Sequence, residues 1–502
     1  MRWIVDDEVR RLDGGRVALG GSPLRFLRLS AAGARAFDDL VAGRPGVPPA
    51  FTDRLVDRGL IHPVLDPIDA IAADDLTVVI PVRDRPAALD RALTALTAPT
   101  ALTLEESDAH GLRNLHGPSV IVVDDGSLDG AAHAAVAHRH GATVIRLDGS
   151  RGPAAARNAG LAEITTPYVA FVDSDVEVSA SSLCLLAGHL RDPAVALAAP
   201  RIEHHGGDRA IDRYEAVASS LDCGDRPAAI RPRSRVAYVP AAAMALRTAA
   251  LRTLGGFDES LHVGEDVDLC WRLDAAGHLC RYDPSVAAVH AGRSSVTSWL
   301  WRIADYGTSA ALLDERHPGQ VPPVAASAWS VGVWILLGAG HPIVAAAGAL
   351  GSGELLARRL RFLDHPRREA FRLVAVGHVG AGRVLGQSLV RPYWPLTLAA
   401  SVVSRRARRV AAVAIVVPVL IEYRQRRPRL DPVRWTALRL ADHIAYSTGV
   451  WRGALSQRRF GALRPDLTSW PGRARAGAGG ASPLSVGAPV TRRSLTSTPA
   501  GA

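Results

Sequence analysis

Three carboxylates follow apolar runs of the chain in a pattern that suits cation and phosphate chemistry. Asp125 comes directly after the run 120–124, and Asp173 and Asp175 come directly after the run 168–172. Two carboxylates at positions i and i+2 after a strand can hold a divalent cation together with the phosphates of a substrate. The same tripeptides are also common in turns, so this pattern alone leaves both a metal site and a plain turn open.

Three further features carry groups of complementary chemistry. A glycine-rich loop leads into a predicted helix whose first turn can bind an anion, and Arg157 on that helix is available for a diphosphate. Glu265 and Asp266 are adjacent acids after a glycine. His290 follows a short apolar run, where an imidazole could complete a metal shell with the acids or serve only as a structural side chain.

Alternating strands and helices are expected to position these residues. Short apolar, β-branched runs predict strands, and each is followed by a helical stretch, which favours a mostly parallel sheet. Ligands of such sheets bind at the carboxyl ends of the strands, where the acids lie. The predicted strands are 76–82, 120–124, 143–147 and 168–172, and the predicted helices are 86–96, a helix capped by Asp129, and 153–164.

Five stretches, taken together and in order, resemble the family 2 glycosyltransferases with the GT-A fold. They are residues 79–84, 122–127, 151–160, 173–175 and 255–272, and the match covers about half of the chain. The resemblance implies an α/β nucleotide-diphospho-sugar transferase domain. Residues 83–85, Arg-Asp-Arg, depart from the pattern, because many members have an aromatic residue and Asn there.

The resemblance also implies a role for each candidate residue. The donor would be a nucleotide diphosphate sugar such as UDP-glucose, with Asp125 bonded to its uracil, and the cofactor would be Mg²⁺ or Mn²⁺. The implied donor-binding residues are Pro81, Asp84, Asp125, Arg157, Asp173 and Arg272; the metal ligands are Asp175, Asp173 and His290; and the catalytic residues are Asp266, as general base, with Glu265 beside it.

The chemistry of glycosyl transfer agrees with these roles. Transfer to a hydroxyl needs a base for the acceptor proton and positive charge to neutralise the departing diphosphate. A single carboxylate base, with attack opposite the leaving group, inverts the anomeric carbon and gives a β-linkage from an α-linked donor. We therefore expect an inverting hexosyltransferase.

Four segments are expected along the chain: 1–70, 71–315, 316–465 and 466–502. The first combines a glycine-turn hairpin, a helix capped by Ser30 and a second helix that leads into a strand at Ile61. It resembles the small winged-helix PqqD-like fold, which implies binding of a precursor-peptide leader or of partner proteins; a structural cap is the alternative. The second segment is the GT-A domain, the third is helical and the last is a predicted disordered tail.

The whole arrangement resembles the glycosyltransferases of mycofactocin systems. This resemblance implies that the acceptor is a peptide-derived redox cofactor, premycofactocin, decorated with β-1,4-linked glucose. Two alternatives remain at this point: a family 2 transferase that acts on a cell-wall or polyprenyl-linked acceptor, and a non-catalytic membrane scaffold in which the acids are turn residues.

The net charge of +10 is concentrated in one region. Residues 354–434 carry 17 arginines and five acids, and the chain contains no lysine. Residues 321–353 contain no Asp, Glu or Arg but are interrupted at 338–342. This favours interfacial or re-entrant helices at the cytoplasmic face of the cell membrane, with arginines on anionic lipids; buried helices of a soluble domain are the alternative. Because apolar runs interleave the arginines, nucleic-acid binding is disfavoured.

Overall fold

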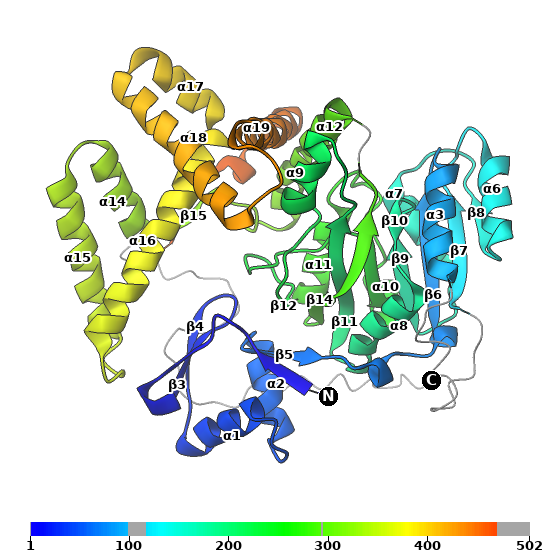
Figure 1. The fold of residues 1–502 in the computed structure, drawn as a ribbon, viewed down its shortest axis with the longest axis horizontal. Coiled ribbons are helices and arrows are strands. Elements are labelled where there is room, and N and C mark those ends of the chain that lie inside the picture. The colour runs from blue at the N-terminus through cyan, green and yellow to red at the C-terminus, as the bar shows by residue number, and fades with distance from the viewer. Residues whose placement is uncertain (1, 99–116, 293–294, 469–502) are drawn as a thin grey trace, which may run out of the picture.

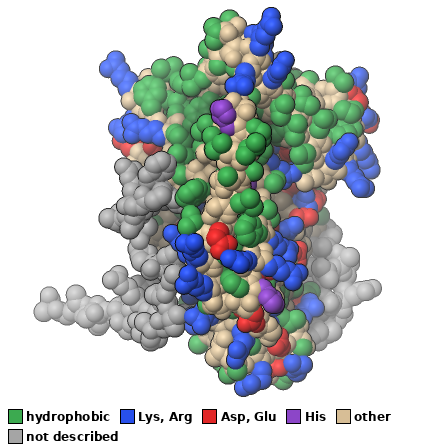
Figure 2. All heavy atoms as spheres, turned by 90° about the vertical axis from the view of Figure 1, so that its left-hand side faces the viewer, with side chains coloured by type: hydrophobic (Ala, Val, Ile, Leu, Met, Phe, Trp, Pro, Cys, Tyr) green, Lys and Arg blue, Asp and Glu red, His purple; other side chains and the backbone are tan. Residues whose placement is uncertain are grey.

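The computed structural model describes residues 2–98, 117–292 and 295–468, which form three parts (Figure 1). An N-terminal unit ends with the 3₁₀ helix η2 (Pro67–Asp69), a central α/β unit runs from β6 (Leu76–Val82) to β14 (Leu279–His290), and a helical region begins at α12 (Val296–Thr308). The helices on the left of Figure 1 expose hydrophobic side chains and arginines on that side of the molecule (Figure 2). The predicted disordered tail lies outside the described residues, apart from 466–468.

A mixed nine-stranded sheet forms the centre of the α/β unit. Its strand order is β10-β14-β11-β13-β9-β6-β7-β8, and β12 pairs with β14. The four predicted strands are confirmed to within one residue at each end, and they are parallel to one another. Strand β13 is antiparallel to both of its neighbours, which the sequence did not predict. The remaining bounds are β7 (Ser119–Asp124), β8 (Thr143–Arg146), β9 (Tyr168–Val172), β10 (Val176–Glu177), β11 (Val195–His204), β12 (Ala228–Ala229) and β13 (Ala243–Arg247).

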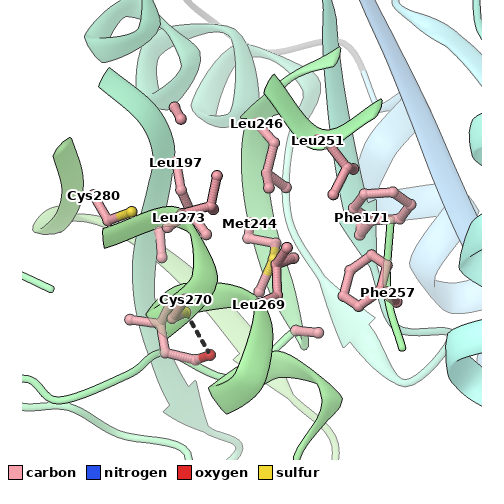
Figure 3. Packing of buried hydrophobic residues seen from close by; sticks show 14 of the residues in the cluster. Phe171, Leu197, Met244, Leu246, Leu251, Phe257, Leu269, Cys270, Leu273 and Cys280 are labelled. Carbon is pink, nitrogen blue, oxygen red and sulfur yellow. Dashed lines mark hydrogen bonds between the residues drawn. The ribbon is translucent and has the colours of Figure 1, made fainter. Parts of the chain in front are cut away.

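Helices cover both faces of this sheet, so neighbouring residues of one strand enter different cores. Val78 and Ile80 pack in the same cluster as Leu89 and Leu93 of α3, whereas Val79 packs in the cluster on the other face. Figure 3 shows part of that second cluster, where Phe171 and Phe257 meet edge to face. The helices are α3 (Pro86–Thr97), α6 (Gly130–Arg139), α7 (Pro153–Glu163), α8 (Ala180–Ala187), η4 (Gly188–Arg191), α9 (Ala210–Ala218), α10 (Thr248–Thr253) and α11 (Glu265–Ala275).

The strand register brings the predicted acids to one edge of the sheet. Val82 of β6 lies opposite Asp124 of β7, so the residues that follow both strands are neighbours. Val176 of β10 lies opposite His290 of β14, and the Asp175 carbonyl accepts a hydrogen bond from the Ala291 N–H at 2.9 Å. Segments more than 110 residues apart in the sequence therefore meet beside the carboxyl ends of the parallel strands.

The N-terminal unit is a small two-sheet fold with two helices. The side chain of Ser30 caps α1 by accepting from the Gly33 N–H at 3.1 Å, as predicted. Phe37, Leu55 and Ile61 form its core with residues of the second sheet. The elements are β1 (Arg2–Val5) paired with β5 (Ile61–Val64), the sheet β2 (Arg10–Leu12), β3 (Val17–Gly20) and β4 (Arg25–Arg28), the 3₁₀ helix η1 (Asp13–Gly15), and the helices α1 (Ala31–Val41) and α2 (Pro49–Asp57). A further 3₁₀ helix, η3 (Ala73–Asp75), leads from this unit into β6.

The C-terminal region is mainly helical, as predicted, and it closes on itself through a short parallel sheet. Strand β15 (Ala325–Ser327) pairs with β16 (Asp466–Thr468), so residues 466–468 belong to this region and not to the predicted tail. The apolar run 321–353 is broken at 339–341 between two helices. The helices are α13 (Ala310–Arg316), α14 (Ala328–Gly338), α15 (Pro342–Arg359), α16 (Pro366–Val390), α17 (Trp394–Val403), α18 (Arg405–Arg426), α19 (Pro432–Gln457) and η5 (Gly461–Leu463).

Glycines allow α19 to approach α12 at backbone distance. A Cβ atom on Gly449 would overlap the carbonyl oxygen of Ala304, and one on Gly307 would overlap the carbonyl oxygen of Tyr446. Only residues without a side chain permit this separation. The close approach also brings α19 against the α/β unit. Trp435 of α19 packs in one buried cluster with Trp299 of α12 and with Tyr214 of α9, a helix of the α/β unit.

We predict that Gly449→Ala lowers the free energy of unfolding by about 1–3 kcal/mol, the usual cost of overpacking a well-packed contact. Gly380→Ala is the control, because Gly380 lies in α16 and a Cβ there meets nothing within 4 Å. That variant should gain up to about 1 kcal/mol from helix propensity. Chemical unfolding of both variants measures the difference, and equal midpoints would contradict the packing argument.

Candidate active site

A cavity of about 650 Å³ opens where the strand ends, helix α11 and the helical region meet. Its lining residues divide by chemistry into a polar half and an aromatic and apolar half. The polar half includes Arg85, Asp125, Arg157, Asp173, Asp175, Glu265 and His290, and the other half includes Tyr238, Pro240, Trp271, Tyr306, Val321, Pro322 and Tyr446. The cavity therefore offers both charged and apolar contacts to a ligand.

Most of the residues predicted from the sequence line this cavity. The eight that do are Pro81, Asp125, Arg157, Asp173, Asp175, Glu265, Asp266 and His290. Asp84 and Arg272 do not line it. The spatial convergence expected for the acids and His290 is therefore observed.

Arg157 is a buried cation shared between two of the acids. Its side chain is only 3% exposed, and its guanidinium donates to Asp173 Oδ1 at 2.7 Å and to Glu265 Oε1 at 2.8 Å. Burial alone would lower the pKa of Arg157, but the two carboxylates outweigh it and raise the pKa above its usual value. The predicted diphosphate contact is therefore replaced, in this structure, by a bridge between the end of β9 and the start of α11.

Asp266 lies in the first turn of α11 and faces the cavity. Gly264 precedes the helix with φ +87°, a conformation that glycine adopts without strain. The Asp266 carboxylate accepts from the Val267 N–H at 2.8 Å and from the Ala241 N–H at 3.2 Å. Burial and the neighbouring charge of Glu265 raise the pKa of Asp266 to about 7, although these N–H groups and Arg157 oppose the shift. A carboxyl with this pKa can take up a proton near neutral pH.

Asp175 and His290 form the part of the cavity best suited to a divalent cation. His290 Nε2 lies 3.6 Å from Asp175 Oδ2, and both side chains are largely buried. Arg85 Nη1 donates to the same Asp175 oxygen at 2.6 Å, while Asp173 is held by Arg157. In residues 2–98, 117–292 and 295–468, no three His, Cys, Asp or Glu side chains come together as a complete metal shell.

Asp125 holds the glycine-rich loop that leads into α7. Its Oδ1 accepts from the Arg151 N–H at 2.7 Å, and its Oδ2 accepts from the Ser150 hydroxyl at 2.8 Å and the Gly152 N–H at 3.0 Å. A carboxylate has about four acceptor positions, so these three bonds leave one for a ligand. Asp125 therefore lines the cavity and also holds the 150–152 loop, which forms part of the cavity wall.

Asp84 and Arg272 stabilise loops outside the cavity, which corrects their predicted places. Asp84 has φ +54°, and its Oδ1 accepts from the Leu128 N–H at 2.9 Å. Arg272 donates to Asp268 at 2.6 Å and to the carbonyls of Leu254 and Gly256. Both were predicted to bind the donor, whereas in this structure their side chains bond to protein groups.

Several cavity residues had no signal in the sequence. Arg85 was visible only as a departure from the family pattern, and Arg302, Tyr306 and Tyr446 come from helices α12 and α19, far along the chain. Only the folded structure shows that these side chains meet the acids.

Comparisons with known proteins show the family to which this chain belongs. The sequence model of glycosyl transferase family 2 matches residues 77–254. The pre-mycofactocin glycosyltransferases of Mycobacterium tuberculosis strains CDC 1551 / Oshkosh and ATCC 25618 / H37Rv are each 40% identical over 476 residues, which is 92% of this chain and 97% of each relative. The succinoglycan biosynthesis protein ExoU of Rhizobium meliloti (strain 1021) is 37% identical over 76 residues, 14% of this chain and 22% of ExoU.

Among solved structures, the mannosyltransferase PcManGT from Pyrobaculum calidifontis, in complex with GDP-Man and Mn²⁺, matches with a TM-score of 0.42. It is 18% identical and covers 83% of this chain and 96% of its own. The M. tuberculosis relatives, in contrast, match almost from end to end at 40% identity. This chain therefore belongs to the pre-mycofactocin glycosyltransferases, within glycosyltransferase family 2.

Proposed function

We propose that this enzyme transfers glucose from UDP-glucose to pre-mycofactocin, with inversion at the anomeric carbon and formation of a β-1,4 linkage. The relatives that match over nearly their whole length are named for pre-mycofactocin, which supports the acceptor. The observation that carries the proposal is that Asp266, with its raised pKa, faces the same cavity as Asp173 and Asp175.

The donor would occupy the polar half of the cavity. Pro81 lies near the end of β6 and Asp125 follows the neighbouring strand β7, and both would contact the uracil. Asp125 has one acceptor position left for it after its three protein bonds. Arg83, Arg85 and Arg302 line the cavity, and their guanidinium groups could reach the diphosphate. Arg157 would act indirectly, by fixing Asp173 and Glu265.

A Mg²⁺ or Mn²⁺ ion fits the Asp175 and His290 pair. Magnesium sites commonly use one or two carboxylates and take their remaining ligands from substrate phosphates and water. Asp175 and His290 would hold the ion, with Asp173 beside them, and the ion would supply positive charge against the departing diphosphate. Arg85 shares Asp175 Oδ2, so binding of the ion requires that this ion pair open.

Asp266 would act as the general base. The acceptor hydroxyl would give its proton to the carboxylate as its oxygen bonds to the anomeric carbon, and the bond from that carbon to the diphosphate oxygen would break with its electron pair. The aromatic half of the cavity, which includes Tyr238 and Tyr446, adjoins Asp266 and offers a surface for the acceptor. Attack from that side, opposite the diphosphate, inverts the configuration.

We predict that Asp266→Asn lowers transfer by about 10²–10⁴-fold, the usual contribution of a general base. Purified protein, UDP-glucose, Mn²⁺ and pre-mycofactocin would be incubated, and added hexose counted by mass spectrometry. The wild-type rate should fall as the pH drops below about 7, because protonation removes the base. Normal turnover by the variant would refute the base assignment, and absence of hexose addition by the wild type would refute the acceptor.

We further predict that Asp175→Asn abolishes the gain in UDP affinity that Mn²⁺ provides. Calorimetric titration of UDP with and without Mn²⁺ measures this gain independently of turnover. Asp148→Asn is the control, because Asp148 is exposed and lies outside the cavity lining. If Asp175→Asn keeps the full effect of Mn²⁺, the ion binds elsewhere.

The N-terminal unit remains a PqqD-like unit by resemblance, with a leader peptide or partner protein as its proposed ligand. Its contacts with the rest of the chain support the alternative of a structural cap. Arg10 binds Glu369 of α16 through two hydrogen bonds, and Phe26 meets Phe362 edge to face. The same unit also reaches the α/β unit through Arg235, so it joins the two larger parts.

We also propose that helices α14 to α18 bind the cytoplasmic face of the membrane. Large apolar side chains stand exposed along them, among arginines (Figure 2). Examples that are more than half exposed are Ile335, Ile343, Val376, Leu396, Val402 and Val413. Of the described helices, α16 alone is long and apolar enough to cross a membrane, and its sequence includes four arginines, which favours a surface position.

We predict that the protein sediments with phosphatidylglycerol vesicles at low salt and is partly released by high salt. Replacing the exposed Arg405, Arg406, Arg408 and Arg409 with Gln should weaken binding, since each arginine near an anionic surface contributes about 1 kcal/mol. Phosphatidylcholine vesicles are the control. Equal sedimentation with both lipids, or no binding to either, would contradict the proposal.

A further inference from the structure

The N-terminal unit is bonded to residues 226–236, the segment of the α/β unit that leads toward β13. The central contact is buried: Asp6 Oδ2 accepts from Arg235 Nη2 at 2.7 Å and bonds to His62 Nε2 at 3.0 Å. Burial would raise the pKa of Asp6, but the hydrogen bonds from His62 and Arg235 outweigh it and hold the pKa well below its usual range. Arg235 is thus tied to a charged carboxylate inside the N-terminal unit.

Further bonds from Arg235 and Arg231 reinforce this attachment. The Arg235 backbone N–H donates to the Ser22 hydroxyl at 2.7 Å, and the Arg235 guanidinium also donates to the Pro227 carbonyl at 2.7 Å. Arg231 donates to the Asp57 carbonyl at 2.9 Å and lies 3.4 Å from Asp274 of α11. The N-terminal unit therefore holds this segment at Arg231 and Arg235, and Arg231 in turn pairs with the helix that carries Asp266.

The next residues, 237–241, form what we call the acceptor wall. Tyr238 and Pro240 line the cavity on its aromatic side. Hydrogen bonds from alternate residues of the wall hold α11: the Ala237 carbonyl accepts from Trp271 Nε1 at 2.7 Å, the Val239 carbonyl accepts from Cys270 Sγ at 3.9 Å, and the Ala241 N–H donates to Asp266 Oδ2 at 3.2 Å. The proposed base is thus bonded to the wall itself.

The donor side of the cavity is fixed by other groups. Asp125 takes its hydrogen bonds from the 150–152 loop, Asp173 is paired with Arg157, and Asp175 is paired with Arg85. All of these partners lie in the α/β unit. A displacement of the N-terminal unit would therefore reach the acceptor wall first and the donor side only indirectly.

We propose that the N-terminal unit positions the acceptor wall and Asp266, with Arg235 as the principal positioning residue and Arg231 as the second. This inference rests on the proposed function, because it assigns the wall to the acceptor. A unit that holds the wall in place lowers the cost of ordering the acceptor site and keeps the base in line with the acceptor hydroxyl.

The test compares two arginines of the same interface. Arg235 is bonded to the buried Asp6, whereas Arg226 forms an exposed ion pair with Glu8 at 3.0 Å. Wild type, Arg235→Gln and Arg226→Gln would be assayed for transfer to pre-mycofactocin, and UDP binding with Mn²⁺ would be titrated by calorimetry. We expect Arg235→Gln to lower kcat/KM for the acceptor roughly 10- to 100-fold, since a displacement of about 1 Å can cost 10² in rate.

The expected signature is a split between the two substrates. Arg235→Gln should leave the Kd for UDP unchanged within about twofold, and Arg226→Gln should match the wild type in both assays, as expected for an exposed pair. Arg235→Lys should recover part of the loss, because one ammonium can still pair with Asp6. An equal loss of donor and acceptor binding, or wild-type acceptor kinetics in Arg235→Gln, would overturn the inference.

Arg231→Gln provides a second, independent test in case Arg235→Gln does not fold. It removes the bonds to Asp57 and Asp274 at a partly exposed position, and it should raise the acceptor KM without changing UDP binding. Amide hydrogen exchange in residues 237–241 should also increase in this variant, and unchanged exchange with an unchanged KM would refute the inference. A wild type that transfers no sugar to pre-mycofactocin would instead refute the proposed function, while faster exchange of the wall would still support the positioning role.

Discussion

The site depends on one buried cation. Arg157 bonds Asp173 at the end of β9 and Glu265 at the start of α11, so it sets the separation between the donor side of the cavity and the helix that carries the proposed base. Buried ion pairs often contribute little net stability, because the charges lose their hydration, but removal of one partner leaves an unpaired charge inside the protein. We therefore infer that the main role of this bridge is to hold Asp173 and Glu265, about ninety residues apart in the sequence, at a fixed separation.

The same bridge explains how two adjacent acids acquire different properties. Glu265 takes the guanidinium of Arg157, whereas Asp266 is left with backbone N–H groups and with the negative charge of its neighbour. Burial raises the pKa of Asp266, and the negative charge of Glu265 raises it further. A base for a hydroxyl proton needs an acceptor position and a raised proton affinity. Each Asp266 oxygen accepts one N–H bond and so keeps a further acceptor position, while burial and the charge of Glu265 raise the proton affinity.

The sequence was informative wherever local chemistry decides structure. Short β-branched runs gave the strands 76–82 and 168–172, Asp129 caps its helix as expected, and parallel strands necessarily bring Asp125 and Asp173 to one edge. Contacts between distant segments could not be predicted in this way. Arg85 reaches Asp175 from ninety residues away, and Asp84 and Arg272 turn from the cavity because nearby backbone groups bind them first. The direction of strand β13 depends on its pairing with β9 and β11, which its own composition does not encode.

The two halves of the cavity take their residues from different parts of the chain. The donor half comes from the α/β unit, chiefly from residues within 77–254, the range that the family 2 sequence model matches. The acceptor half that we propose combines the wall at 237–241 with Tyr306 of α12 and Tyr446 of α19, and Arg235, just before the wall, is bonded to the N-terminal unit. Nucleotide sugars are common to many transferases, whereas acceptors differ. An acceptor site assembled from all three parts would require similarity beyond the transferase domain, and the M. tuberculosis relatives match 92% of this chain.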